Sequence, residues 1–210
     1  MLDKQAILFP HEAFRENQEN MIEIVKNSIE NRKNLLLNAP TGLGKTDSTL
    51  PMALSHALAN NLTVFFLTPR HTQHKIAIDS LRSIKQKYNK NIIAMDLIGK
   101  RWMCLQAGAS ILPSNQFIEY CKDLREKDLC QYYLNFKQSG KISNEAKQAL
   151  NTIKNLSPLD VEHSVSISSN HQVCPYEIAL MLAKEARVVI ADYYHTVSYT
   201  HLTLPTTPYV

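Results

Sequence analysis

The chain has 210 residues and a formal net charge of +4, from 23 lysines and arginines against 19 aspartates and glutamates. Hydrophobic residues make up 44% and charged residues 20%, which excludes wholesale disorder and permits a nucleic-acid partner without requiring one. No apolar run reaches the roughly 18 residues of a membrane span, and residues 1–14 lack the apolar region of a signal peptide. We expect a soluble protein without a membrane partner, cytoplasmic or nucleoid-associated, or nuclear in a eukaryote.

Helices and short apolar strands alternate along much of the chain. Apolar residues at helical spacing predict helices over residues 12–31, 46–59, 74–88 and 175–186. Short apolar runs predict buried strands over residues 34–39, 62–67, 92–97 and 187–193. This alternation favours an α/β fold with a parallel sheet that helices cover on both faces.

The alternation stops between about residues 99 and 174. This stretch is richer in charged and polar residues, has helical patches over 116–133 and 143–155, and holds all four cysteines of the chain. We interpret residues 99–174 as a mostly helical insertion into an α/β domain formed by 1–98 and 175–196.

A phosphate-binding loop follows the first predicted strand. Residues 39–46 read A-P-T-G-L-G-K-T, which matches the pattern G-x-x-x-x-G-K-[ST] except for Ala39 at its first position. The two glycines allow backbone N–H groups to point at an anion at the start of the next helix. The candidate residues for binding ATP are Thr41, Gly42, Leu43, Gly44, Lys45 and Thr46. Lys45 is expected to reach the β- and γ-phosphates, and Thr46 to bind Mg²⁺; these two are the candidate catalytic residues.

Upstream of the loop, Arg15 and Gln18 form an R-x-x-Q pattern near the start of the first predicted helix. The amide of Gln18 can both donate to and accept from adenine, so the pair is a candidate adenine site. By itself the pattern also suits an ordinary surface helix start.

The four cysteines leave two readings open. They are Cys104, Cys121, Cys130 and Cys174, and no two of them form a C-x-x-C pair. Scattered buried thiols would explain this spacing. Their confinement to one insertion instead favours a four-thiolate site, either a [4Fe–4S] cluster or all-cysteine zinc.

Together these segments resemble the amino-terminal part of XPD-type iron–sulfur DNA helicases of superfamily 2, which include XPD and DinG-like enzymes. The matching segments, in family order, are R-x-x-Q, residues 39–46, T-P-R-H-T-Q (68–73), G-K-R-W-M-C (99–104) and the block C-P-Y-E-I-A-L-M-L-A-K-E-A-R-V-V-I-A-D-Y-Y-H (174–195). The resemblance covers residues 1–196 and implies a partial RecA-like P-loop domain with an iron–sulfur insertion.

The resemblance also assigns ligands. It implies that the four cysteines hold a [4Fe–4S] cluster and that residues 68–73 line the path of single-stranded or forked DNA. The candidate nucleic-acid contacts are Arg70, Thr72, Gln73 and Lys100. An alternative for 70–73 is a strand-to-helix turn capped by Thr72. Trp102 and the pair Tyr132–Tyr133 are suited to stacking on bases, but we expect them in the insertion's core.

The chain departs from the family after the last strand, where no D-E-A-H box follows. Residues 197–210 are threonine-rich and carry no acidic residue; a β-like tail is one reading, and a non-native or disordered tail is the one we favour. The expected function is the front half of the motor of an ATP-dependent 5′-to-3′ DNA helicase, inactive as this chain alone. Alternatives are a nucleotide- and DNA-binding fragment without turnover and a zinc-stabilised P-loop ATPase.

Overall fold

The computed structural model describes residues 7–138 and 140–193. The segment 197–210, expected to be a non-native tail, lies outside these residues. The helices described are α1 (Gln18–Glu30), α2 (Lys45–Asn60), α3 (His71–Tyr88), α4 (Ser114–Glu126), α5 (Gln131–Phe136), α6 (Asn144–Leu156), α7 (Val161–Asn170) and α8 (Pro175–Ala183), with short 3₁₀ turns η1 (Lys100–Met103) and η2 (Ala109–Ile111). The strands described are β1 (Val64–Leu67), β2 (Ala94–Leu97), β3 (Lys137–Gln138), β4 (Lys141–Ile142) and β5 (Val188–Ala191).

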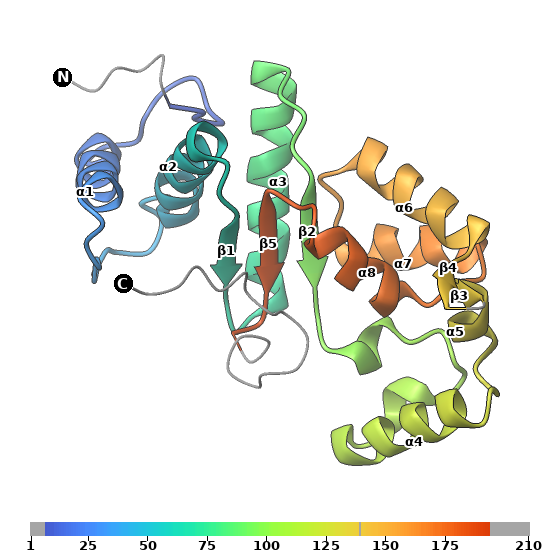
Figure 1. The fold of residues 1–210 in the computed structure, drawn as a ribbon. Coiled ribbons are helices and arrows are strands. Elements are labelled where there is room, and N and C mark those ends of the chain that lie inside the picture. The colour runs from blue at the N-terminus through green and yellow to red at the C-terminus, as the bar shows by residue number, and fades with distance from the viewer. Residues whose placement is uncertain (1–6, 139, 194–210) are drawn as a thin grey trace.

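The central sheet has three parallel strands in the order β1-β5-β2 (Figure 1). Val188 at the start of β5 is in register with Val64 of β1 and with Ala94 of β2. The strand that comes last in the described chain therefore lies in the middle of the sheet. The predicted α/β fold with a parallel sheet flanked by helices is confirmed, and it corresponds to a partial RecA-like domain.

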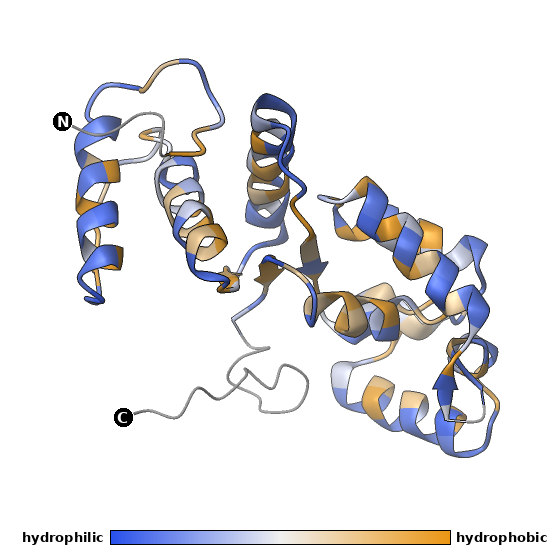
Figure 2. Cartoon of the chain, turned by 45° about the horizontal axis from the view of Figure 1, so that its top comes forward, coloured by the Kyte–Doolittle hydropathy of each residue, from blue (hydrophilic) through white to orange (hydrophobic). Residues whose placement is uncertain are grey.

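Helices bury both faces of the sheet. One face packs against α2 and α3, and its apolar core includes Leu54, Ile78 and Leu81 together with Val188 and Ile190 of β5. The other face packs against α6 and α8, with Val189 and Ala191 turned toward them. Because successive strand residues point to opposite faces, two-sided burial requires a continuous apolar run, as β5 has. The orange hydrophobic faces of these helices turn inward in Figure 2.

The predicted strand over 34–39 is wrong. These residues form no strand in the structure; Leu36 is fully exposed and Leu35 is 41% exposed. An extended segment becomes a strand only when a neighbour completes its backbone hydrogen bonds, and no described strand pairs with this one. Leu37 nevertheless packs against a small core formed between α1 and α2.

The insertion differs from the expected pattern in two places. The helical patch over 116–133 is divided into α4 and α5, because Asp128 adopts the left-handed conformation (φ 54°) and Leu129 N–H donates to Leu124 O at 2.8 Å. Helix α7 was not predicted. It begins at the side chain of Asp160, which accepts from the backbone N–H of His163 at 3.0 Å.

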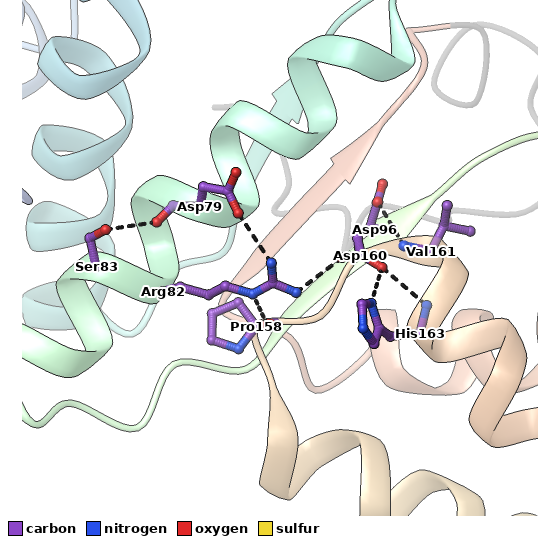
Figure 3. A network of polar contacts seen from close by, with 8 residues as sticks. All are labelled: Asp79, Arg82, Ser83, Asp96, Pro158, Asp160, Val161 and His163. Atoms are coloured by element: carbon purple, nitrogen blue, oxygen red, sulfur yellow. Dashed lines mark hydrogen bonds and ion pairs between the residues drawn. The ribbon is translucent and has the colours of Figure 1, made fainter.

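A polar network ties the segment between α6 and α7 to the sheet and to α3 (Figure 3). Arg82 of α3 donates to Pro158 O at 3.0 Å and to Asp160 Oδ2 at 3.1 Å. Asp96, a buried carboxylate on β2, accepts from the backbone N–H of Val161 at 3.0 Å. The segment between α6 and α7 is therefore held by charge-assisted hydrogen bonds as well as by apolar burial.

We predict that Asp160→Asn destabilises the fold near neutral pH. Burial works to raise the pKa of Asp160, but hydrogen bonds from the side chain and backbone of His163 and from Arg82 outweigh it and lower the pKa to about 2. A depressed folded-state pKa gives stability that is present above the unfolded pKa of about 4 and is lost as the pH falls toward 2. After allowance for solvent screening we expect a loss of about 1–2 kcal/mol at pH 7, measured by urea unfolding.

The pH dependence provides the control for this prediction. The wild-type chain should lose this stability between about pH 4 and pH 2, whereas Asp160→Asn lacks the titrating group and should not. A stability difference that stays constant over that interval would mean that the carboxylate charge does not matter.

Candidate functional site

The predicted phosphate loop precedes α2. Lys45 is the first residue of α2, and its ammonium donates to Ala39 O at 3.0 Å and to Pro40 O at 2.9 Å. Gly42 and Gly44 have φ angles of 88° and 82°, which only glycine adopts without strain. The loop thus curls back around its own lysine at the positive end of a 16-residue helix. Thr41, Gly42 and Lys45 are exposed, so an anion in solution has access to them.

The R-x-x-Q pair lies directly against this loop. Arg15 Nη1 donates to Gly42 O at 2.6 Å, and Gln18 Nε2 donates to Gly44 O at 3.3 Å. Gln18 is only 1% exposed, and its Oε1 accepts from the backbone N–H of Arg15 at 2.9 Å. The amide nitrogen and the amide oxygen of Gln18 therefore both form hydrogen bonds with the backbone. The structure brings the two predicted segments together, with Gln18 bracing the loop.

The four cysteines come from four elements and line one small cavity of about 20 Å³. Cys104 follows η1, Cys121 lies on α4, and Cys130 and Cys174 immediately precede α5 and α8. All four are free thiols. Among the described residues, no three Cys, His, Asp or Glu side chains are arranged to hold a metal ion. The four thiols therefore line one cavity, but they do not surround a metal position as a complete set of ligands.

The surroundings favour the protonated thiols of Cys104 and Cys174. Burial raises the pKa of Cys104, and the neighbouring thiols of Cys121 and Cys130 add to this effect. Burial raises the pKa of Cys174 to about 12, against the opposing charge of Lys100. A metal that binds thiolates here has to displace protons, so its binding must depend on pH.

Two of the four predicted nucleic-acid residues, Thr72 and Lys100, line adjoining cavities. Arg70 precedes α3, and Thr72 and Gln73 lie in its first turn. Thr72 lines one cavity of about 580 Å³, and Lys100 lines another of about 910 Å³. The capping role considered for Thr72 is wrong: α3 begins one residue earlier and has no side-chain cap bond. Instead Thr68 Oγ1 accepts from Arg70 N–H at 3.4 Å and donates to Gln73 Oε1.

The aromatic residues of the insertion do not all lie in a core. Trp102 is 54% exposed, so the expectation of a buried indole is wrong. Tyr132 and Tyr133 are half-buried, and the guanidinium of Arg125 lies 3.8 Å from the ring centre of Tyr133. Trp102 precedes Met103, which is fully buried, and this anchoring residue leaves its neighbour in the short turn η1 at the surface.

Sequence reasoning missed a buried pair beside the first cavity. His74 of α3 and Asp96 of β2 are each 2% exposed, and His74 Nδ1 lies 2.6 Å from Asp96 Oδ1. Asp192, which follows β5, lies 3.6 Å from His74 Nε2. The available signal was one carboxylate within the otherwise apolar run over 92–97, since a buried charge needs a partner.

A three-stranded parallel sheet with helices on both faces defines an α/β protein with a partial RecA-like domain. The chain belongs to the DEAD_2 family, whose model matches residues 66–201. The resemblance to XPD-type helicases of superfamily 2 is thereby confirmed. Among the described residues, none of the helices is both long and apolar enough to cross a membrane.

Two curated relatives are similar over most of this chain. The "General transcription and DNA repair factor IIH helicase subunit XPD" of Dictyostelium discoideum is 23% identical over 205 residues, covering 89% of this chain. The "Regulator of telomere elongation helicase 1 homolog" of Caenorhabditis briggsae is 24% identical over 221 residues, covering 90% of this chain. The match spans only 25% and 21% of the length of these two proteins.

We predict that Gly44→Ala destabilises the fold more than Gly42→Ala. Both positions have positive φ, so both substitutions incur about 1–2 kcal/mol of backbone strain. A Cβ at Gly44 would also lie 2.6 Å from Gln18 Nε2, whereas nothing lies within 4 Å of one at Gly42. Displacing Gln18 should cost about 1 kcal/mol more, measured by urea unfolding. Equal losses in the two variants would show that Gln18 does not brace the loop.

Proposed function

We propose that this chain forms the front part of the motor domain of an ATP-dependent DNA helicase. One observation carries the proposal. The predicted phosphate loop stands at the start of α2 with Lys45 inside its curl; Arg15, just before α1, and Gln18, the first residue of α1, form hydrogen bonds with it. Family membership and two helicase relatives support the same reading. Because the chain spans about a quarter of their length or less, the activity of the whole protein is part of the proposal.

In this proposal residues 39–46 bind the phosphates of ATP. Lys45 exchanges its bonds with the carbonyl groups of Ala39 and Pro40 for bonds with the β- and γ-phosphates. Thr46 supplies a hydroxyl to Mg²⁺, which neutralises charge on the phosphates when it is bound. Thr41 and Leu43 shape the same loop, and Gln18 and Arg15 position it. Adenine lies near Gln18, as the family resemblance implies.

We propose that the insertion over 99–174 is held together by a [4Fe–4S] cluster on Cys104, Cys121, Cys130 and Cys174. Their convergence on one cavity from four elements supports this set of ligands. Four thiolates suit an iron–sulfur cluster, which would crosslink η1, α4, α5 and the start of α8. Its role would be structural. All-cysteine zinc is the rival, and metal analysis separates the two.

Single-stranded or forked DNA is the proposed partner, contacted by Arg70, Thr72, Gln73 and Lys100. Arg70 and Lys100 supply positive charge for phosphates, and Thr72 and Gln73 supply hydrogen bonds. The 5′-to-3′ polarity follows only from the family resemblance. The relatives are named for transcription, DNA repair and telomere elongation, which favours a nuclear location if the protein is eukaryotic.

We predict that Lys45→Ala abolishes measurable ATP binding by this chain. A charge-assisted hydrogen bond contributes roughly 1.5–3 kcal/mol, and Lys45 is expected to make more than one with the phosphates. Isothermal titration calorimetry with Mg-ATP measures the loss. Lys90→Ala, which removes an exposed lysine after α3, should keep wild-type affinity. Equal affinity of Lys45→Ala and wild type would refute the nucleotide assignment.

We predict that replacing any one of the four cysteines by serine removes the iron. A hard oxygen ligand is poorly suited to an iron–sulfur centre, so iron and sulfide content should fall together. The resulting disorder should concentrate in η2 and α4, because η1, α5, α6 and α7 all place side chains in or against the apolar core that they share with α8 and the sheet. Hydrogen exchange measures this distribution. Zinc without sulfide in the wild-type chain would favour the rival site instead.

A further inference from the structure

The side chain of Trp102 lies between the two segments proposed to contact DNA. It lines the cavity of about 580 Å³ that Thr72 also lines, and the cavity of about 910 Å³ that Lys100 also lines. Both volumes fall within the range of about 300–1,000 Å³ that is typical of ligand pockets. The indole therefore stands where a strand running from the start of α3 to η1 would pass.

The larger cavity combines aromatic surface with positive charge. Four cations, Lys100, Arg101, Lys122 and Arg125, line it together with one carboxylate among the described residues, Glu126. Lys122 pairs with Glu126 at 3.7 Å, and both Lys100 and Arg125 pair with Glu177, at 3.8 Å and 3.0 Å. An excess of positive charge remains, which suits an anionic ligand.

Arg101 places a planar cation against the indole ring of Trp102, the ring on which a flat ligand would stack. Its guanidinium lies 4.3 Å from the ring centre of Trp102, and its Nη1 donates to Leu112 O at 2.6 Å. Neither contact neutralises the charge of Arg101. With a planar cation over one face of the exposed indole, the other face is left to stack on a nucleobase, and the cation adds charge for its phosphate.

We propose that Trp102 is a stacking platform for a base of single-stranded DNA, which connects the contacts at Thr72 with those at Lys100. The proposal rests on the proposed function, since it assumes that DNA follows these two segments. Stacking on an aromatic side chain tolerates any base, so Trp102 should add affinity without sequence preference. Arg101 acts beside it as a phosphate contact.

The chain offers a direct probe, because Trp102 is its one tryptophan. Titration of the full 210-residue chain with oligothymidylate should quench the intrinsic fluorescence of Trp102 as base and indole stack. Trp102→Ala should weaken binding of a dye-labelled oligothymidylate, measured by anisotropy, by about 5- to 100-fold. Trp102→Phe retains an aromatic face and should recover most of the affinity. Ile111→Ala removes an exposed apolar side chain of the insertion outside both cavities and should bind like wild type.

The outcomes separate this inference from the proposed function. If the wild-type chain binds DNA but its fluorescence is unchanged, or if Trp102→Ala binds equally well, the stacking role is wrong. In that case loss of affinity in Arg70→Ala would still support DNA binding by residues 68–73. If the wild-type chain binds no single-stranded DNA, both the stacking role and the DNA contacts of the proposed function are wrong.

Discussion

The pairing of β5 between β1 and β2 is the constraint on which the rest of the structure depends. β5 hydrogen-bonds along both edges, so the sheet forms only when the chain that leaves β2 returns after the whole insertion. Parallel strands must be joined by crossovers, and this crossover carries every cysteine. α8 leads directly from Cys174 into the region of β5, so the position of the last cysteine and the position of the central strand fix one another.

The sequence predicted those elements whose signal is local. The apolar runs that became β1, β2 and β5 were each recognised, with ends that differ by at most two residues. The run over 34–39 looks the same in the sequence but has no described partner strand, and pairing is a property of the sheet rather than of the segment. Helix α7 was missed because its serines and valines have weak helix propensity; its start depends on Asp160 and its position on contacts with α3.

The candidate site likewise has parts that the sequence predicted and parts that only the fold revealed. Glycines, lysine and threonine in fixed order predict a phosphate loop without any tertiary information. The contact of Gln18 with Gly44 joins residues that are far apart in sequence, and only the packing of α1 on α2 reveals it. Likewise the number of cysteines suggested a shared site, whereas their arrangement around one cavity required the fold. Trp102 was wrongly expected in the core, because composition does not say which side of a short turn is buried.

The bonds of Lys45 to Ala39 and Pro40 have a consequence for exchange of ligands. If the ammonium of Lys45 had no hydrogen-bond partner within the protein, the shape of the loop would depend on the bound anion. Here two carbonyl groups already accept hydrogen bonds from the ammonium of Lys45. They occupy the donor positions that an incoming anion would use. Any phosphate must compete with these carbonyl groups, which lowers its net affinity. In return the loop keeps a defined shape when no anion is bound.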